Sequence, residues 1–351
     1  MKSVIRFKSN IIMINHVAVK TDYTMGFIGL GKMGWRMAEL IEARIRSSGG
    51  IQLEDGVIRR LIVYDIREDL IFKFTEEHLG SEGIKDLNVV GKRANLVWIM
   101  IPHEEVSRVA TTLAENMREG IIIDGGNSDP RVSIRLAERL KSRGIDFVDV
   151  GCSGGPYKVG ELSLMVGGDK RVYERILPLL KVFGEPFYVG PNGMGHLVKV
   201  ANNDLEYILM AGIGEVIAWL RRASTDLVGK EVDVVTALKA INSGLVESRL
   251  LGLAIEILEE DPELVERVKP YVPGGTLAAW TLEISKDFPI PFITLALLQR
   301  ILSREEDYSV RLRRLLRDIK RLSQIKDERF SIQALIRNKF GGHEFFFKES
   351  G

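Results

Sequence analysis

The chain has 351 residues, of which 45% are hydrophobic and 28% charged, and its formal net charge is +1. This length suits two domains, and the near-zero charge gives no electrostatic reason to expect binding to nucleic acid or to an acidic membrane. The single cysteine, Cys152, excludes a disulfide within the chain and is compatible with the reducing cytoplasm, where we expect the protein. No run approaches the roughly 18 apolar residues of a membrane-spanning helix.

The first 24 residues are expected to form an N-terminal extension. They carry Lys2, Arg6 and Lys8 and a short apolar patch, but no small-residue cleavage site of the signal-peptide type follows. We interpret this segment as a loose extension, or as translation begun upstream of the natural start. The first strand is expected from about Met25.

Short apolar runs alternate with amphipathic helical segments between residues 25 and 190. The expected strands are Gly26–Gly29, Leu61–Asp65, Leu96–Ile101, Gly120–Asp124, Phe147–Val150 and Leu162–Gly167. Continuous apolar runs of this kind are typical of parallel strands that are buried on both faces. With helices such as Pro130–Arg143 between them, they predict a doubly wound α/β domain of Rossmann type over residues 25–190.

Helical patterns alone follow after about Gly190. The expected helices are Gly195–Arg222, Leu227–Asn242, Leu250–Leu258 and Pro291–Leu302. The sequence therefore predicts an α/β domain followed by a second, all-α domain over residues 191–351.

A glycine-rich motif follows the first expected strand and begins a helix. It reads Gly29-Leu30-Gly31-Lys32-Met33-Gly34, which has the GxGxxG form. Its glycines permit a tight turn and let a pyrophosphate approach the backbone at a helix N-terminus. These six residues are candidate contacts to a dinucleotide cofactor.

Asp65 ends the second expected strand, where a carboxylate can accept hydrogen bonds from both ribose hydroxyls and repels a 2′-phosphate. This favours NAD over NADP, although Arg67 could meet a phosphate, so NADP stays open. The interval from Gly34 to Asp65 is longer than usual for this motif, and we expect a loop around Ser47–Gly56 to account for the excess.

Two turns of small residues follow later strands. They are Asp124–Ser128, which reads DGGNS, and Gly151–Gly155, which reads GCSGG. Ligands of open α/β sheets bind at the carboxyl ends of the strands, where small residues let a substrate lie against the backbone. Asn127 and Ser153 offer hydrogen bonds there. Two ordinary tight turns remain the alternative.

The helix expected from Gly195 has a polar face of five side chains, each of a different chemical type: an imidazole, an amine, an amide, a carboxylate and a phenol. Its members, at steps of three or four, are His196, Lys199, Asn203, Glu206 and Tyr207. The opposite side is apolar and carries Leu197, Val198, Ala201, Leu205 and Ile208. A solvated polar face is one interpretation. The mixture of side chains, placed directly after glycine-rich turns, favours an active site in which burial makes a lysine available as a base.

These motifs resemble those of the 6-phosphogluconate dehydrogenases, particularly their shorter form, within the β-hydroxyacid dehydrogenase superfamily. The resemblance spans about Met25 to His343. The matching segments are GLGKMG at 29–34, DGGNS at 124–128, DVGCSGG at 149–155, LMVGG at 164–168, GHLVKVANNDLEY at 195–207 and RNKFGGH at 337–343.

The resemblance implies oxidative decarboxylation of a small sugar acid, 6-phosphogluconate, with NAD or NADP and without a metal. Lys199 would take the C3 hydroxyl proton, Glu206 would protonate C1 of the enediol, and Asn203 would complete the catalytic set. The other implied substrate contacts are Asn127, Ser153, Gly154 and Gly155, with Tyr207, Arg337 and His343 at the phosphate end. Ile101 and Asn127 join the cofactor contacts. The C-terminal tail would complete the partner subunit's site, which implies a homodimer or a dimer-based tetramer.

Several residues depart from the family pattern. Asn202 and Asp204 stand where the family usually has His and Gly, and Ala279 rather than a cation precedes a Trp-Thr pair. Ser248 aligns with the family's phosphate-binding Arg, with Arg249 one residue away. Phosphate recognition depends on such charge-assisted contacts.

Two alternative functions follow from these departures. The first, motivated by the lost cations, is a dehydrogenase for an unphosphorylated or otherwise substituted sugar acid or a 3-hydroxy acid. The segment after Gly155 also differs from the family, although Lys158 could supply a new cation there. The second is a non-catalytic nucleotide-binding protein, against which the presence of both Lys199 and Glu206 argues.

Overall fold

The computed structural model describes residues 21–268 and 276–284. The helix expected over Pro291–Leu302 and the candidate residues Arg337 and His343 lie outside the described residues. No described helix has both the length and the apolar character that crossing a membrane requires.

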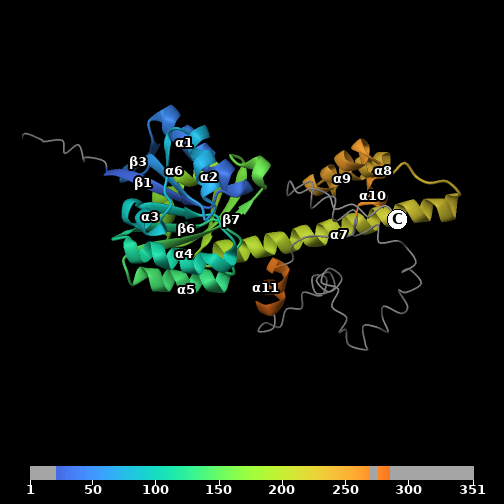
Figure 1. Ribbon diagram of the computed structural model, residues 1–351. Helices are drawn as coiled ribbons and strands as arrows, with labels where there is room; N and C mark the ends of the chain where they lie inside the picture. The colour runs from blue at the N-terminus through green and yellow to red at the C-terminus, as the bar shows by residue number, and fades with distance from the viewer. Residues whose placement is uncertain (1–20, 269–275, 285–351) are drawn as a thin grey trace, which may run out of the picture.

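The strands of the described residues form one mixed sheet (Figure 1). They are β1 (Thr21–Ile28), β2 (Ile51–Gln52), β3 (Gly56–Tyr64), β4 (Ser81–Gly83), β5 (Leu96–Ile99), β6 (Gly120–Asp124), β7 (Ile145–Ser153), β8 (Leu162–Gly167) and β9 (Gly184–Gly190). The order is β2-β3-β1-β5-β6-β7-β8-β9, and β4 pairs with β3. The chain leaves β1 toward β3 on one side and later returns to β5 on the other, so the topological switch point lies between β1 and β5.

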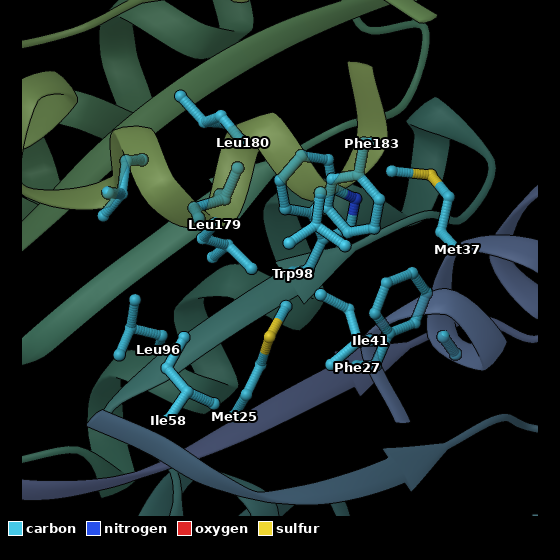
Figure 2. Packing of buried hydrophobic residues seen from close by; sticks show 14 of the residues in the cluster. Met25, Phe27, Met37, Ile41, Ile58, Leu96, Trp98, Leu179, Leu180 and Phe183 are labelled. Atoms are coloured by element: carbon cyan, nitrogen blue, oxygen red, sulfur yellow. The ribbon is translucent and has the colours of Figure 1, made fainter. Parts of the chain in front are cut away.

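Helices cover both faces of the sheet. One face packs against α1 (Lys32–Ser48), α2 (Glu68–Glu77) and α6 (Lys170–Phe183), and the other against α3 (Leu87–Arg93), α4 (His103–Asn116) and α5 (Pro130–Lys141). Successive strand residues feed opposite cores: Ile121 and Ile123 enter the first, and Ile122 the second. Figure 2 shows the first core, where Trp98 of β5 meets Phe183 of α6 edge to face at 4.7 Å. The expected doubly wound domain is confirmed.

The sheet differs from the expectation at its edges. β8 runs antiparallel to β7, whereas most of the apolar runs were interpreted as parallel strands. The eight residues 154–161 between them are too short for a crossover, which needs a dozen or more. β9 was not expected; it carries Pro186, which is tolerated at a sheet edge.

The segment Ser47–Gly56, expected to be a loop, contains some regular secondary structure, since α1 extends to Ser48 and β2 pairs with β3. β1 begins at Thr21, before Met25.

The chain after the sheet is helical, as expected. α7 (Met194–Val228) has 35 residues and is about 52 Å long. It leaves the sheet and reaches α8 (Val234–Asn242), α9 (Arg249–Glu260) and α10 (Leu264–Arg267), which share an apolar core with its far half. α11 (Thr276–Ile284) lies beside the near half. Leu227, the expected start of the next helix, is instead in the last turn of α7, because the helix ends at Gly229 with φ 74°.

Candidate active site

Asp149 fixes the start of α7 against the sheet. Its carboxylate is fully buried at the middle of β7 and accepts hydrogen bonds from the backbone N–H groups of Gly193 (2.7 Å) and His196 (3.0 Å). These groups belong to the first turn, where a helix has unpaired donors and favours negative charge. The sequence reading had not singled out Asp149 for this role.

The polar face of α7 is turned inward. Lys199 is 7% exposed and Asn203 2%, whereas Leu205 on the opposite side is 57% exposed. The interpretation of a solvated polar face is therefore wrong. His196 belongs to the buried side but pairs through Nδ1 with Ser133 Oγ of α5, at 2.7 Å.

A cavity of about 280 Å³ lies in front of this face; we call it the lysine cavity. Six of the expected catalytic and substrate residues border it, and they are Lys199, Asn203, Glu206, Asn127, Gly154 and Gly155. They come from α7 and from the turns after β6 and β7, which are neighbouring strands. The fold thus brings together residues that are far apart in the sequence.

Asp124 holds the DGGNS turn in shape. Its buried carboxylate accepts hydrogen bonds from the Gly126 N–H (3.0 Å) and the Ser128 hydroxyl (2.6 Å). Gly125 lies against Trp98, where a Cβ would stand 2.4 Å from the indole nitrogen. The turn presents Asn127 to the lysine cavity and to the cavity that adjoins it.

The GCSGG turn is also tied to α7. The Ser153 hydroxyl, which is expected to bind substrate, donates a hydrogen bond to Asn202 Oδ1 of α7 at 3.4 Å. Cys152 borders the lysine cavity, and burial raises the pKa of its thiol to about 12, opposed by the nearby positive charge of Lys199. The thiol is therefore protonated at neutral pH.

The glycine motif forms the tight turn that was expected. Gly29 has φ 96°, and a Cβ on Gly34 would stand 2.0 Å from the Gly29 carbonyl oxygen. Gly31 caps α1 without a side-chain hydrogen bond, and a Cβ built on it would meet nothing within 4 Å. The first N–H groups of α1 therefore face open space, which fits the pyrophosphate of a dinucleotide.

A second cavity of about 500 Å³ opens at this turn; we call it the glycine-loop cavity. It is bordered by Gly31, Lys32, Met33 and Gly34, and by Ile101 and Asn127, all expected cofactor contacts. Lys32, Met33, Met100, Gly126 and Asn127 also border the lysine cavity, so the two adjoin. Tyr207, expected at a substrate phosphate, borders the glycine-loop cavity instead of the lysine cavity.

Asp65 lies at the end of β3, next to the glycine turn. Its carboxylate accepts hydrogen bonds from the N–H groups of Leu30 (2.6 Å) and Arg67 (2.8 Å). The Arg67 guanidinium pairs with Asp69 at 2.7 Å, and this contact lowers the pKa of the Asp69 carboxyl.

Other residues singled out in the sequence take part in local contacts. Lys158 forms an exposed ion pair with Glu161 at 2.7 Å and borders neither cavity. Ser248 caps α9. Among residues 21–268 and 276–284, no group of three or more His, Cys, Asp or Glu side chains could hold a metal ion.

Seven residues that border the glycine-loop cavity were not among the expected site residues, and they are Met100, Pro102, His103, Glu104, Gly126, Leu277 and Trp280. His103 begins α4 after β5, and Leu277 and Trp280 come from α11. The position of His103 just past the end of a strand was an available signal. The Trp-Thr pair of α11 was noted as part of the family pattern, but that pattern does not indicate which cavity Trp280 borders.

Comparison with known proteins gives matches along most of the chain. The model of the NAD binding domain of 6-phosphogluconate dehydrogenase matches residues 24–190, and that of the 6-phosphogluconate dehydrogenase C-terminal domain matches residues 195–340. A putative 6-phosphogluconate dehydrogenase of Bacillus subtilis, YqeC, is 27% identical over 329 residues, covering 91% of this chain and 98% of that protein.

Two further relatives extend the comparison. The NAD(+)-dependent, decarboxylating 6-phosphogluconate dehydrogenase of Haloferax volcanii is 28% identical over 306 residues, covering 84% of this chain and 95% of that protein. The structure of 3-hydroxyisobutyrate dehydrogenase from Mycobacterium tuberculosis has a TM-score of 0.65 at 17% identity, covering 91% of this chain and 99% of that one. That likeness shows a shared fold.

Proposed function

The chain belongs to the 6-phosphogluconate dehydrogenase family, and we propose that it oxidises and decarboxylates 6-phosphogluconate to ribulose 5-phosphate. As a member, it is an oxidoreductase that acts on a CH–OH group with a nicotinamide dinucleotide. The observation that carries the proposal is the adjoining pair of cavities. One holds Lys199 and Glu206, the other begins at a pyrophosphate-type turn, and Asn127 borders both.

Lys199 is the proposed general base. When bound, the nicotinamide accepts the hydride from C3 of the sugar acid. The Lys199 amine takes the proton of the C3 hydroxyl, and as an ammonium it then polarises the new C3 carbonyl while the carboxylate leaves as carbon dioxide. Its burial at the lysine cavity shields it from bulk water, and Asn203, one turn along α7, is the proposed hydrogen-bond partner of the substrate.

Glu206 is the proposed general acid. It borders the same cavity from the next turns of α7 and would protonate C1 of the enediol that decarboxylation leaves. Base and acid stand on one rigid helix, whose start is held by Asp149, so their separation is fixed by the helix itself.

NAD is the proposed cofactor. The support is Asp65, a carboxylate beside the glycine turn at the end of the second long strand, where NAD-type sites have an acidic residue, together with the ion pair of Arg67 with Asp69. We further propose that Tyr207, Arg337 and His343 serve the phosphate end of the substrate. In this arrangement, the C-terminal tail completes the site of a partner subunit in a homodimer or a dimer-based tetramer.

A second candidate function is oxidation of a 3-hydroxy acid or sugar acid without a 6-phosphate. The lysine cavity favours it in one respect: among the described residues, the cations that border the cavity are Lys32 and Lys199. Lys158 is exposed and forms an ion pair with Glu161, and it does not border the lysine cavity. A phosphate bound in this cavity would therefore need a ligand other than Lys158.

A substrate panel on the purified protein tests both candidates. We expect 6-phosphogluconate to be oxidised with release of one carbon dioxide per NADH formed, at a higher kcat/KM than gluconate or 3-hydroxyisobutyrate. Reduction of NAD without carbon dioxide, or a clear preference for a substrate without phosphate, would support the second candidate instead.

A further inference from the structure

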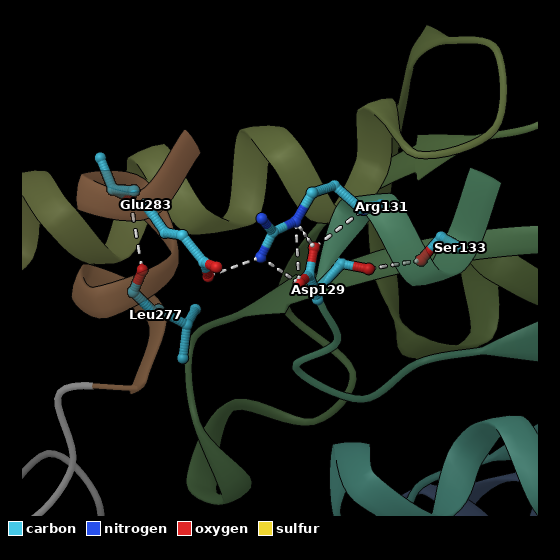
Figure 3. A network of polar contacts seen from close by, with 6 residues as sticks. Asp129, Arg131, Ser133, Leu277 and Glu283 are labelled. Carbon is cyan, nitrogen blue, oxygen red and sulfur yellow. Dashed lines mark hydrogen bonds and ion pairs between the residues drawn. The ribbon is translucent and has the colours of Figure 1, made fainter. Parts of the chain in front are cut away.

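α11 lies against the wall of the glycine-loop cavity and is held there by contacts from two other elements. Glu283 forms an ion pair with Arg131 of α5 at 2.8 Å, and Asp129 forms a second ion pair with the same guanidinium (Figure 3). On the side of α7, the Thr281 hydroxyl donates to the buried carboxylate of Asp204. Trp280 directly precedes Thr281 on this helix, so the two polar contacts hold the turn that carries it.

Trp280 faces the glycine-loop cavity. Its side chain is 9% exposed and packs with Val200 and Leu277 in a small apolar cluster. Its ring is 4.8 Å from the ring of His103, centroid to centroid, with 43° between the planes. Both rings border the cavity, one from α11 and the other from the start of α4.

The walls of this cavity indicate which half of a dinucleotide it would hold. They come from the first turn of α1 and from the residues that follow β5 and β6, while Asp65 at the end of β3 is not among them. A dinucleotide in a doubly wound sheet crosses the switch point, with its adenosine ribose at the acidic residue of the second strand. The glycine-loop cavity therefore fits the nicotinamide half.

We propose that Trp280 and His103 form an aromatic wall against the nicotinamide half of the cofactor, and that Asp204 and Arg131 are positioning residues that hold α11 there. The proposal rests on the nicotinamide-cofactor part of the proposed function and is independent of the sugar acid. Flat aromatic rings gain from contact with the face or edge of another ring, and a nicotinamide offers such a ring.

Calorimetric titration without substrate tests this assignment. The ligands are NADH and ADP-ribose, which keeps both riboses and the pyrophosphate of NADH and lacks only the nicotinamide ring. Trp280→Ala is expected to weaken NADH binding about 3- to 10-fold, the range that an aromatic contact supports, and to leave ADP-ribose binding unchanged. Trp280→Phe, which keeps a ring, is expected to retain most of the NADH affinity.

Fluorescence supplies a second readout. Energy transfer from tryptophan to bound NADH is expected to fall more in Trp280→Phe than in the control variant, although Trp35 and Trp98 remain as donors. The matched control is Trp219→Phe, because Trp219 lies on α7 but is 65% exposed and borders neither cavity. That variant is expected to keep both the NADH affinity and the greater part of the energy transfer.

Should Trp280→Ala fail to fold, Glu283→Gln weakens the exposed ion pair with Arg131 and is expected to reduce NADH affinity by about twofold, with ADP-ribose unaffected. Equal losses for NADH and ADP-ribose in the Trp280 variants would assign Trp280 to the stability of the fold, and unchanged NADH binding would remove it from the cofactor site. A wild-type protein that binds ADP-ribose normally but neither NADH nor NADPH would instead overturn the proposed function.

Discussion

Gly151 and Lys199 are in such close contact that a Cβ on Gly151 would stand 2.4 Å from the Cβ of Lys199. This contact seats α7 on β7. We expect Gly151→Ala to push the helix outward, to lower kcat at least tenfold, and to cost roughly 1 to 3 kcal/mol of stability through overpacking. Steady-state kinetics and denaturant unfolding measure the two effects.

The control for this change is Gly212→Ala on the same helix. A Cβ there would meet nothing within 4 Å, so the variant should keep its activity and gain about 0.5 to 1 kcal/mol of helix stability. Full activity in Gly151→Ala would show that the seating of α7 does not set the position of Lys199.

Lys199→Met is expected to reduce kcat by a factor of about 10² to 10⁴, the usual contribution of a general base, without loss of NADH binding.

Glu206→Gln should slow the overall reaction to a similar degree but leave a rapid first formation of NADH, because the acid acts after the hydride has left. Stopped-flow absorbance of NADH distinguishes the two variants, because only Glu206→Gln is expected to show the rapid first formation of NADH. Lys158→Met, on the exposed turn, serves as the charge-matched control and should be fully active.

Asp65→Ala should weaken NAD binding by about 10- to 100-fold, because a charged acceptor of hydrogen bonds is lost. The ratio of NAD affinity to NADP affinity should also fall in this variant. The comparison is Asp69→Ala, which removes an exposed carboxylate two residues from Arg67 and is expected to leave NAD affinity intact. An Asp65→Ala protein that still rejects NADP would show that another group excludes the 2′-phosphate.

Asp204 should make stability depend on pH. Burial raises the pKa of its carboxyl to about 6, against the lowering effect of the Thr281 hydrogen bond. The folded state therefore holds this proton more tightly than the unfolded state. The stabilising contribution is complete below the unfolded pKa, near 4, and is lost as the pH rises through about 6.

We accordingly expect Asp204→Asn, which stays neutral, to be more stable than the wild type at about pH 8, by no more than about 3 kcal/mol, and the gain to shrink toward about pH 4. Urea unfolding of both proteins across this range measures the difference. Asp226→Asn, at an exposed position of α7, controls for removal of a charge from the same helix. A gain that does not change with pH would contradict the assignment to Asp204 ionisation.

The sequence predicted best the features that are set by local pattern. The bounds of β6 and β8 coincide with the expected strands, and the glycine turn lies where its motif placed it. Helical spacing predicted the polar face of α7, and the mixture of its side chains after glycine-rich turns favoured burial of that face. The direction of β8 depends instead on the length of the segment 154–161, which connects it to β7. β9 was not predicted because it contains Pro186 and has a weak apolar pattern at the sheet edge.

The contribution of α11 to the site could not have been read from its sequence. Trp280 reaches the glycine-loop cavity only because Arg131 and Asp204, both distant in the chain, hold α11 in place. Likewise, Ser153 had the right chemistry to bind a substrate, and only the fold shows that its hydroxyl is engaged by Asn202.

The two hydrogen bonds that Asp65 accepts from Leu30 and Arg67 have a consequence for protein engineering. The carboxylate that would select the cofactor also holds the backbone of the phosphate turn in shape. A redesign toward NADP that merely deletes this side chain would loosen the turn on which both cofactors depend. Such a redesign has to supply a substitute acceptor for the Leu30 amide together with the new cation.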